Sequence, residues 1–336
     1  MSIPHTKKKS TLCPMNNILI TSAGRRVSLV RIFKKELRRF FLDAKVYTTD
    51  ADPCLSSACY ESDGAIKVSR NDAEGYIEEL LALALSLGIK IIIPTIDTGL
   101  QILADNKEEF AKKGITVLIC SKQLVKIFRD KRITHSFFSH YGIDTPKLYD
   151  KQSLQFPLFI KPYDGSMSID TYQIKTRQDI SKKHLRDKRS MFMEYIDRSV
   201  FQEYTIDMYY DKNYDLKCLV PRKRIEIREG EISKGITVKN YVFEFLKQKL
   251  NHIDGALGCL TLQLFYNPEK DIVKAIEVNP RFGGGYPLSY LAGANYPEYI
   301  IREYLLNEKI DQCNEWEQSL LMLRYDDEIL VHGSDL

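Results

Sequence analysis

Three side chains that could hold a metal ion or a phosphate stand at every second position of AIEVNPRFGGGYP, residues 275–287. They are Glu277, Asn279 and Arg281: a carboxylate, an amide and a guanidinium. If this stretch is a strand, all three lie on one face, because successive side chains of a strand point to opposite sides. An earlier apolar stretch, LTLQLFY, carries Gln263. If the two strands pair, Gln263 lies beside Glu277 and Asn279.

This set of groups suits a hard cation better than a protein core. Mg²⁺ prefers carboxylate and amide oxygens and leaves positions open for phosphate oxygens, and Arg281 could bind the same phosphates. The run Gly283–Gly285 that follows would let the backbone approach a bound group closely, where a side chain would collide. A solvated hairpin face with a salt bridge has the same spacing, so the residues alone leave both interpretations open.

A second group of candidate residues follows an apolar strand. In FPLFIKPYDG, Lys161 has apolar neighbours and precedes a loop that contains Gly165, Ser166 and Ser168. A lysine at this point can reach one phosphate while the amides of the loop bind another, although a lysine on an edge strand would show the same pattern. Lys131, in FRDKRITHSFF, begins a basic helical stretch, where a lone lysine is usually solvated.

Carboxylates also stand near the ends of apolar strands. The stretch FMEYI ends in Glu194, Tyr195 and Ile196, which offer one carboxylate and several backbone groups. Glu203 and Asp207 follow in FQEYTIDMYY. Acids at the edge of an apolar wall suit the amino group of adenine and the hydroxyls of ribose, but each of these residues alone is a weak signal.

Other common site patterns are missing from the sequence. TSAGRR follows a strand and opens a helix, so it could hold a phosphate or a carboxylate at the helix N-terminus. It does not have the GxGxxG spacing of a dinucleotide fold, which argues against a dehydrogenase that binds nicotinamide in the first half. GEISKG is not a P-loop, because no Lys-Ser or Lys-Thr pair follows its second glycine, and no GxSxG is present.

Two kinds of secondary-structure pattern position these residues. Up to Cys120, apolar strands alternate with amphipathic helices, which predicts a parallel α/β sheet covered on both sides. After Cys120 longer strands follow at hairpin spacing, which predicts an α+β half with mostly antiparallel pairing. The predicted strands are 17–23, 44–50, 89–97, 115–120, 156–162, 171–176, 190–196, 200–211, 214–230, 231–239, 258–268 and 271–281. The predicted helices are 26–40, 75–88, 99–114, 121–142, 177–188 and 242–253, with a helix and short tail after about Asn307.

The composition is that of an ordinary globular protein. The 336 residues are 44% hydrophobic and 28% charged, and the net charge of +4 is too small to indicate a nucleic-acid-binding protein. No stretch approaches the roughly 20 apolar residues of a membrane helix, and the first apolar run does not have the pattern of a signal peptide. The seven cysteines are scattered without a CxxC pair, which is typical of reduced thiols in a cytoplasmic protein.

Taken together and in order, these segments resemble the ATP-grasp superfamily, and within it the carbamoyl-phosphate-synthase-type, single-chain carboxylate–amine ligases. The resemblance runs from about Asn17 to Asn307. Its most specific part is a glutamine on one strand followed by Glu-x-Asn-Pro-Arg on the next, here Gln263 and Glu277–Arg281. The stretch VPRKRIEIREGEISKGITVKN, 220–240, is also similar to that family.

The resemblance implies a parallel α/β pre-ATP-grasp domain followed by an ATP-grasp fold of two subdomains. The implied division is a flexible tail over 1–16, the pre-ATP-grasp domain over 17–120, the small lid subdomain with linker helices over 121–196, the C-terminal subdomain over 197–310, and a C-terminal helix or tail over 311–336.

The resemblance also implies roles for individual residues with ATP and Mg²⁺, or Mn²⁺, as cofactors. Glu277 and Asn279 would hold the metal with Gln263 beside them, and Arg281 would contact the γ-phosphate and the acyl phosphate. TSAGRR and PTIDTG would face the acceptor pocket. The other implied contacts are Lys131 and Lys161 with the α- and β-phosphates, Gly165, Ser166 and Ser168 in the phosphate loop, Glu194, Tyr195 and Ile196 at adenine, Glu203 at ribose, and Arg222, Lys234 and Thr237 between nucleotide and acceptor.

The implied activity joins a small-molecule carboxylate to an amine through an acyl phosphate, with ATP converted to ADP and phosphate. The implied partners are these substrates and a second copy of the chain, because members of the superfamily often form dimers; no nucleic acid and no membrane is expected. Two alternatives remain. Met167 and Asp170 stand where the family has glycines in its phosphate loop, so the chain could bind nucleotide without ligation. It could also activate carbonate or carbamate.

The nature of the acceptor is a separate question. Arg25, Arg26, Arg222 and Arg224 favour an anionic acceptor, because arginine binds carboxylates and phosphates well. Arginines are also common on protein surfaces, so the sequence leaves this interpretation open.

Overall fold

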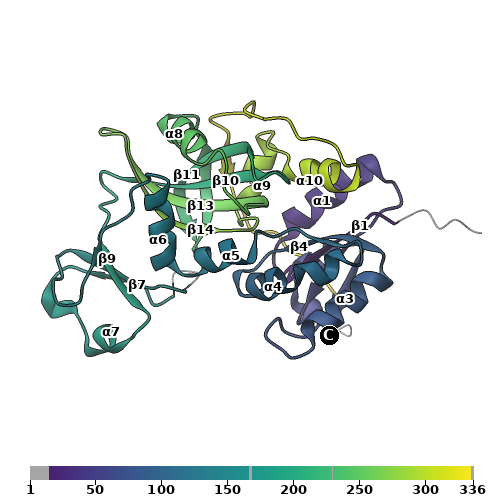
Figure 1. The fold of residues 1–336 in the computed structure, drawn as a ribbon, viewed down its shortest axis with the longest axis horizontal. Coiled ribbons are helices and arrows are strands. Elements are labelled where there is room, and N and C mark those ends of the chain that lie inside the picture. Colours follow the sequence, from purple (N-terminus) through teal and green to yellow (C-terminus); the bar gives the residue numbers. More distant parts are fainter. Residues whose placement is uncertain (1–14, 166–168, 229, 334–336) are drawn as a thin grey trace, which may run out of the picture.

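The first half of the chain folds as a five-stranded parallel sheet with helices around it (Figure 1). The computed structural model describes residues 15–165, 169–228 and 230–333. Ile18, Leu19 and Ile20 of the central strand are fully buried, as expected for a strand covered on both faces. The strand order is β3-β2-β1-β4-β5, with β1 (Asn17–Thr21), β2 (Val46–Asp50), β3 (Gly64–Lys67), β4 (Ile89–Pro94) and β5 (Thr116–Val117). The helices are α1 (Val27–Phe40), α2 (Ser57–Glu61), α3 (Tyr76–Ser86) and α4 (Leu100–Ala111).

The predicted parallel α/β sheet is therefore confirmed, with one addition. The sequence pattern does not reveal the edge strand β3 or the short helix α2 before it. In β3 the side chains alternate between half-buried and exposed, and Ile66 is its one large apolar residue. Such a short edge strand lacks the continuous apolar run that identifies the central strands.

The second half contains two antiparallel sheets, as predicted. Figure 1 shows the six-stranded sheet between the parallel sheet and the four-stranded sheet. The larger has the order β14-β13-β10-β11-β12-β15, with β10 (Gln202–Tyr210), β11 (Leu216–Arg228), β12 (Glu231–Thr237), β13 (Gly258–Asn267), β14 (Ile272–Asn279) and β15 (Leu321–Leu323). The smaller has the order β6-β9-β7-β8, with β6 (Leu148–Tyr149), β7 (Leu158–Pro162), β8 (Tyr172–Ile174) and β9 (Ser190–Glu194). The helices are α5 (Lys122–Arg129), α6 (Lys131–His140), α7 (Lys182–Arg186), α8 (Tyr241–Lys249), α9 (Tyr286–Leu291) and α10 (Tyr296–Leu305).

The basic helical stretch predicted over 121–142 is two helices rather than one. Asp130 separates α5 from α6 with an extended backbone, φ −102° and ψ 107°. Its carboxylate accepts from the amide of Arg132 at 2.9 Å and so caps the second helix. This break places Lys131 at the first residue of α6, which is where the sequence predicts a helix start.

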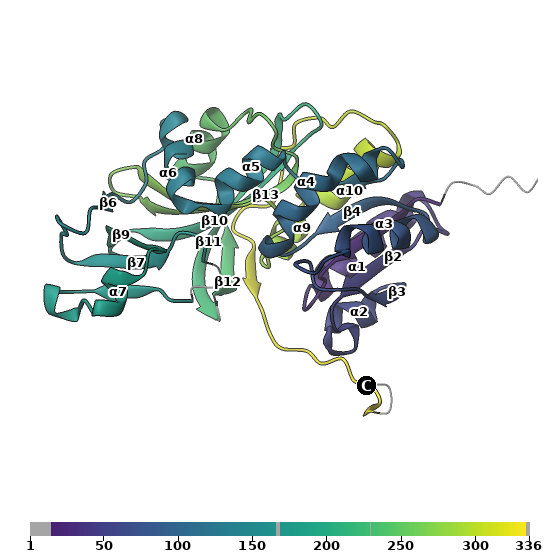
Figure 2. The same cartoon turned by 60° about the horizontal axis from the view of Figure 1, so that its bottom comes forward.

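The C-terminal segment differs from the predicted helix and tail. Helix α10 ends before Asn307, and residues 306–333 contain no α-helix. Leu321–Leu323 instead form β15, which pairs antiparallel with β12. The physical reason is that β12 would otherwise be a bare sheet edge, whose unpaired amides and carbonyls a further strand can satisfy. Figure 2 shows this segment running along β12 and on toward the N-terminal domain.

The hydroxyl of Thr237 fixes the approach to this last strand. It donates to the Glu317 carbonyl at 2.7 Å and accepts from the Leu320 amide at 3.0 Å. Thr237 is fully buried. Its side chain therefore holds the C-terminal segment against the sheet, which is a structural role and not the acceptor contact that the resemblance implies.

None of the helices within the described ranges is long and apolar enough to cross a membrane. The cysteines that the structure describes are all free thiols.

Candidate active site

Two adjoining cavities lie where the three sheets meet. The larger has a volume of about 380 Å³ and is lined by loops of the N-terminal domain and by the six-stranded sheet. The smaller has a volume of about 170 Å³ and lies between the six-stranded and four-stranded sheets. Both are lined by Lys131, Gly165, Gln263 and Glu277. The two cavities therefore adjoin at these residues, which mark their junction.

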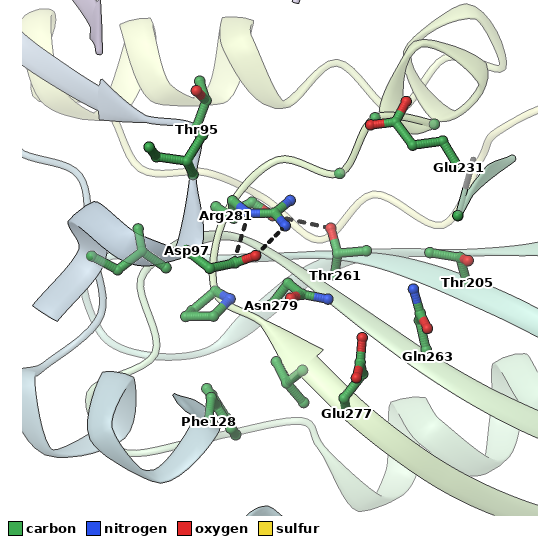
Figure 3. A pocket seen from close by; sticks show the side chains of 18 of the residues that line it. Thr95, Asp97, Phe128, Thr205, Glu231, Thr261, Gln263, Glu277, Asn279 and Arg281 are labelled. Atoms are coloured by element: carbon green, nitrogen blue, oxygen red, sulfur yellow. Dashed lines mark hydrogen bonds and ion pairs between the residues drawn. The ribbon is translucent and has the colours of Figure 1, made fainter. Parts of the chain in front are cut away.

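Strands β13 and β14 bring the predicted metal-binding residues together. Gln263 pairs with Glu277, and Thr261 pairs with Asn279, in one antiparallel register. Figure 3 shows Gln263, Glu277 and Asn279 along these neighbouring strands. One carboxylate and two amides thus lie side by side at the junction.

A β-bulge at Ile276 breaks the strict alternation that the sequence predicts for β14. Leu264 pairs with Ala275 and Gln263 with Glu277, so Ile276 is the extra residue. As a result Ile276 and Glu277 are both half-buried, and both line the smaller cavity. An apolar side chain and a carboxylate therefore stand next to each other on the same wall.

Lys131 and Lys161 approach Glu277 from different elements. The Nζ of Lys131 lies 3.5 Å from Glu277 Oε2 and donates to the Gly165 carbonyl at 2.6 Å. The Nζ of Lys161, on β7, lies 4.0 Å from the same carboxylate oxygen. Both lysines are buried.

These groups shift one another's pKa values. Burial lowers the pKa of Lys161 to about 8; the attraction of Glu277 opposes this shift and the repulsion of Lys131 adds to it. Burial alone would raise the pKa of Glu277, but Lys131 and Lys161 hold that pKa below its usual value. Glu277 is therefore an ionised carboxylate between two buried amines.

Part of the predicted phosphate loop lies outside the described residues: Ser166, Met167 and Ser168. Gly165, the residue before them, lines both cavities. Only this part of the loop can therefore be placed against the site.

The carboxylate of Asp170 points to the four-stranded sheet and its helix. It accepts from the Tyr172 hydroxyl at 3.2 Å and lies 3.7 Å from the Nζ of Lys183. It is not among the residues that line the two cavities. Its negative charge is therefore partnered away from the junction.

The smaller cavity has mostly apolar walls. Strand β9 ends at Glu194, so the backbone of Tyr195 and Ile196 leaves the sheet where the cavity begins. The carboxylate of Glu194 accepts from the Nζ of Lys274 at 2.6 Å on both oxygens, which neutralises its charge. The apolar lining comes from Pro146, Phe159, Pro162, Ile169, Met193, Ile196, Phe265 and Ile276.

Glu203 lines the same cavity and is held by two arginines. Its Oε1 accepts from Arg224 at 2.7 Å, and its Oε2 lies 3.2 Å from a guanidinium nitrogen of Arg198. The two arginines therefore hold the carboxylate of Glu203 in place in the wall of the cavity.

Arg281 lines the larger cavity and is bound by a residue of the N-terminal domain. Its Nε and Nη2 donate to the two carboxylate oxygens of Asp97 at 2.8 and 2.7 Å, and its Nη1 donates to the Phe282 carbonyl at 3.1 Å. Burial alone would lower the pKa of Arg281, but Asp97 raises it above its usual value. Figure 3 shows this ion pair closing one side of the cavity.

Arg222 is fully buried beneath the larger cavity. Its Nε and Nη2 donate to Asp207 at 2.8 and 3.0 Å. The same carboxylate accepts from the hydroxyls of Ser289 at 2.6 Å and Thr261 at 3.3 Å. The Nη1 of Arg222 has no hydrogen-bond partner among the described residues, so the guanidinium is held rigidly with one donor group unused.

Lys234 does not come to the site with the other predicted residues. Its Nζ donates to Glu226 at 2.6 Å, both side chains are about half exposed, and Lys234 lines neither cavity. β11 and β12 pair Glu226 with Lys234 directly, and this cross-strand pair accounts for its position.

The three glycines after β14 make room for side chains of the site. An added Cβ on Gly283 would meet Thr261 at 3.0 Å, and one on Gly285 would meet Arg222 Nη1 at 2.2 Å. One on Gly284 would meet Arg26 Nη1 at 2.4 Å. The sequence predicts that these glycines permit close approach to a bound group; in the structure Gly284 and Gly285 permit close approach of arginines that line the cavity, and Gly283 permits close approach of Thr261.

Sequence reasoning does not single out two acidic residues of the larger cavity. Asp97 lies in PTIDTG, which the resemblance places at the acceptor pocket, three positions beyond Pro94, the last residue of β4. Glu231 begins β12 and has no comparable signal, because only the fold brings it to Arg26. Both pair with arginines across the boundary between the N-terminal domain and the six-stranded sheet.

The residues at the junction fit a magnesium nucleotide by their chemistry. Two buried amines stand beside an apolar cavity, and Glu277, Asn279 and Gln263 supply one carboxylate and two amides. The described residues bring together no group of three or more His, Cys, Asp and Glu side chains that could hold a metal ion. A Mg²⁺ ion at Glu277 would therefore take its further ligands from phosphate oxygens and water, as this ion commonly does.

Comparison with known families gives matches to two parts of the chain. Residues 18–118 match the family described as PylC-like, N-terminal domain. Residues 186–327 match the family described as ATP-grasp in the biosynthetic pathway with Ter operon. The second match covers the whole six-stranded sheet, including β13, β14 and β15.

Known proteins with similar sequence or structure agree with these matches. The D-alanine–D-alanine ligase of Francisella tularensis subsp. tularensis (strain WY96-3418) is 28% identical over 116 residues, which are 32% of this chain and 38% of that relative's length. The biotin carboxylase domain of Hydrogenobacter thermophilus 2-oxoglutarate carboxylase, solved with MgADP, ADP and bicarbonate, has a TM-score of 0.69 at 14% identity over 91% of this chain and 73% of that one. The L-amino acid ligase from Bacillus licheniformis has a TM-score of 0.66 at 14% identity over 87% and 75%.

The chain is a member of the ATP-grasp superfamily with a PylC-like N-terminal domain.

Proposed function

We propose that this chain is an ATP-dependent carboxylate–amine ligase that forms an amide and releases ADP and phosphate. The observation that carries the proposal is the junction of the two cavities, where Glu277 stands beside the buried Lys131 and Lys161, with Gln263 and Asn279 on the same pair of strands. The smaller cavity would take the adenosine part of ATP. The larger cavity would take the acceptor substrate.

The nucleotide would be held by residues of three elements. Lys131 and Lys161 would bind the α- and β-phosphates, and Glu203 would accept from the ribose hydroxyls. Glu277 and Asn279, with Gln263 beside them, would hold Mg²⁺. When bound, this ion neutralises phosphate charge and polarises the transferred phosphoryl group. One solved neighbour of the same fold, the Hydrogenobacter biotin carboxylase domain, contains MgADP, which supports this assignment.

The first step would be attack of a substrate carboxylate oxygen on the γ-phosphorus of ATP. The new oxygen–phosphorus bond forms as the bond to the β–γ bridging oxygen breaks, and ADP leaves. Arg281 has five N–H donors; Asp97 takes two and the Phe282 carbonyl takes one, which leaves two for the transferred group. Fixed donors of this kind stabilise developing charge without reorganisation.

The second step would be attack of the amine nitrogen on the carbonyl carbon of the acyl phosphate. The tetrahedral intermediate collapses, the carbon–oxygen bond to phosphate breaks, and the amine nitrogen gives its proton to the departing phosphate. No side-chain nucleophile takes part, so the chain acts by positioning its substrates and stabilising charge. A homodimer is part of the proposal, supported by the dimer of the Hydrogenobacter domain.

Phosphate release from Mg-ATP tests the proposal. The purified chain would be assayed against a panel of carboxylates paired with amines, with bicarbonate included. The Glu277→Gln variant keeps the shape of the side chain and removes its charge, so release should fall at least about a hundredfold. Glu244→Gln is the matched control, because Glu244 is an exposed residue of α8 and lines neither cavity.

Release that needs both partners, and that Glu277→Gln abolishes, would support the ligase and identify its substrates together. Release with bicarbonate alone would indicate a carbonate-activating enzyme instead. Binding of ATP with no release across the panel would favour a nucleotide-binding module. If ATP does not bind, every role proposed above is wrong.

A further inference from the structure

A cluster of arginines stands at the larger cavity, away from the metal-binding strands: Arg25 and Arg26 line the cavity, and Arg324 does not line it but contacts the lining residue Glu231. Arg26, from the loop before α1, donates through Nη1 to Glu231 Oε1 at 3.2 Å. Arg324, one residue beyond β15, donates through Nη1 to Glu231 Oε2 at 3.0 Å. Arg25 Nη2 lies 3.9 Å from Glu231 Oε1. We call Arg25, Arg26, Glu231 and Arg324 the arginine wall.

Among the described residues, the less exposed part of this wall holds two guanidinium groups and one carboxylate. Arg26 and Arg324, whose side chains are only 18% and 30% exposed, share Glu231, which is 26% exposed, whereas Arg25 is 60% exposed. Burial lowers the pKa of Arg26, and neighbouring guanidinium groups lower it further against the single attraction of Glu231. An excess of buried charge of one sign is unfavourable unless a counter-ion binds.

Three of the four other arginines that line the larger cavity are paired with carboxylates. Asp97 pairs with Arg281, Asp207 with Arg222, and Glu203 with Arg224. The fourth, Arg129, has no carboxylate partner among the described residues. Positive charge in excess of carboxylates is therefore found in the lining at the arginine wall and at Arg129.

The arginine wall packs closely on the loop of glycines, where a side chain would collide with it. An added Cβ on Gly284 would lie 2.4 Å from Arg26 Nη1 and 2.5 Å from Glu231 Oε2. The carbonyl of Gly284 accepts from Arg324 Nη2. Beside it, Gly285 covers the Nη1 of Arg222, which has no partner among the described residues. The guanidinium groups of Arg26 and Arg324 therefore lie against Gly284, and that of Arg222 lies against Gly285.

The wall belongs to the acceptor part of the space. Arg25, Arg26 and Glu231 line the larger cavity and not the smaller one, whereas Glu277 and Gln263 line both. Figure 3 shows Glu231 apart from the row of Gln263, Glu277 and Asn279. A group bound at the wall is therefore distinct from the phosphates of ATP at the junction.

We infer that the arginine wall binds an anionic group of the acceptor substrate, a carboxylate or a phosphate that does not itself react. Arg26 would contact this group through a guanidinium fork, the geometry that suits both anions. Glu231 is a positioning residue, because it holds Arg26 and Arg324 in place. The inference rests on the proposed function and adds the class of substrate to it. It also gives the C-terminal segment a role in recognition, through Arg324.

Anion binding to the nucleotide-loaded protein tests the inference. The full chain is first saturated with Mg²⁺ and AMP-PNP, a nonhydrolysable ATP analogue, so that the phosphate sites at the junction are filled. Glutarate and inorganic phosphate are then titrated separately by calorimetry. The wild type should bind at least one of them, and the arm that binds identifies the anion as a carboxylate or a phosphate.

Three variants and a control make the test specific. Arg26→Gln and Arg324→Gln should weaken anion binding about tenfold or more and leave AMP-PNP affinity within about twofold. Glu231→Gln keeps the shape of the wall and removes its negative charge, so it should strengthen anion binding about threefold or more. Arg31→Gln should have no effect, because Arg31 is an exposed residue of α1 paired with Glu61 and lines neither cavity.

Two results would overturn the inference. One is a wild-type AMP-PNP complex that binds neither anion. The other is an Arg26→Gln variant that binds them as the wild type does. Failure to bind AMP-PNP is a different outcome, which contradicts the proposed function and the inference that rests on it. Thermal unfolding of each variant confirms that the loss of binding is not a loss of fold.

Discussion

The charge of Lys161 depends on how the fold surrounds it. The groups that face its amine are Glu277 on β14 and Lys131 and His135 on α6. Burial lowers the pKa of Lys161 to about 8, and burial lowers the pKa of His135 to about 4, so His135 is neutral near pH 7. Below about pH 8 Lys161 is therefore a buried cation, and above it the lysine becomes neutral.

We predict that affinity for Mg-AMP-PNP falls as the pH rises through the pKa of Lys161. The protonated amine attracts phosphate and the neutral amine does not, so the dissociation constant should increase about tenfold between about pH 7 and about pH 9.5. Binding near about pH 8.5 should also take up protons, because the phosphates raise the pKa again. Calorimetry in buffers of different ionisation enthalpy measures both effects.

The Lys161→Arg variant is the control for this prediction. Arginine stays protonated over the whole range, so the fall in affinity should flatten in the variant. An equal slope for the wild type and Lys161→Arg would show that another group titrates.

At the residue scale, the sequence predicts the residues that belong to a recognisable motif. It does not predict the residues with which they form ion pairs. Gln263, Glu277 and Asn279 follow from strand alternation and a known pattern, and the register of β13 and β14 places them together. The partner of Arg281 is Asp97, which is 184 positions away in the chain. No local pattern relates residues at that separation, so such a pair is known only from the folded chain.

At the scale of elements, the loop of three glycines is the most tightly restricted connection of the site. Gly285 has φ −92°, which any residue can adopt, so its restriction is one of space. An added Cβ would lie 2.2 Å from Arg222 Nη1 and 2.5 Å from a methyl group of Ile232. Arg222 cannot move aside easily, because Asp207 holds two of its three nitrogens.

We predict that Gly285→Ala destabilises the chain by about 1–3 kcal/mol, the usual cost of overpacking a well-filled site. Acceptor-dependent phosphate release should fall at least about tenfold, because the loop lines the acceptor cavity. Gly284→Ala should cost less stability, since its near neighbours, Arg26 and Glu231, are ends of partly exposed side chains that can shift. Urea unfolding followed by circular dichroism gives both free energies.

Gly75 provides the comparison, because its backbone conformation and not its surroundings restricts which residue can stand there. Gly75 has φ +82° and nothing within 4 Å of an added Cβ. Gly75→Ala should therefore cost about 1–2 kcal/mol through backbone conformation alone and leave phosphate release unchanged. A Gly285→Ala variant as active as Gly75→Ala would contradict the steric explanation.

The elements themselves are well predicted where their own residues determine them. The apolar runs of β1 and β4 and the hairpin spacing of β10 to β14 are enough to identify these strands from the amino-acid sequence. The bulge at Ile276 and the strand β15 are not predictable in this way. Each depends on what lies beside it: the bulge on the register with β13, and β15 on the open edge of β12.

At the scale of the whole molecule, two ion pairs connect the N-terminal domain to the six-stranded sheet across the larger cavity. One joins Asp97 to Arg281 and the other joins Arg26 to Glu231. Helix α1 also packs against α10. The acceptor cavity therefore has walls from both halves of the chain, and its shape depends on how they are held together.

We predict that Asp97 and Arg281 are energetically coupled. A double-mutant cycle with Asp97→Asn and Arg281→Gln should give a coupling free energy of about 1–3 kcal/mol in urea unfolding, because the side chains are only 17% and 14% exposed. Asp97→Asn should also lower kcat for phosphate release with little change in the KM for ATP, since Arg281 loses its orientation and not its charge. Additive free energies would contradict the coupling, and an unchanged kcat would show that Asp97 does not orient Arg281.

The pairing of β12 with β15 has a consequence for how the chain is synthesised. Gly235 emerges from the ribosome well before its partner Met322, so β12 presents an open edge while the intervening helices and strands are being made. The parallel N-terminal sheet, whose strands all precede residue 118, can fold early. An exposed sheet edge on a nascent chain is a site for pairing with other chains, so the ribosome-bound intermediate is the species of this protein that most needs a chaperone.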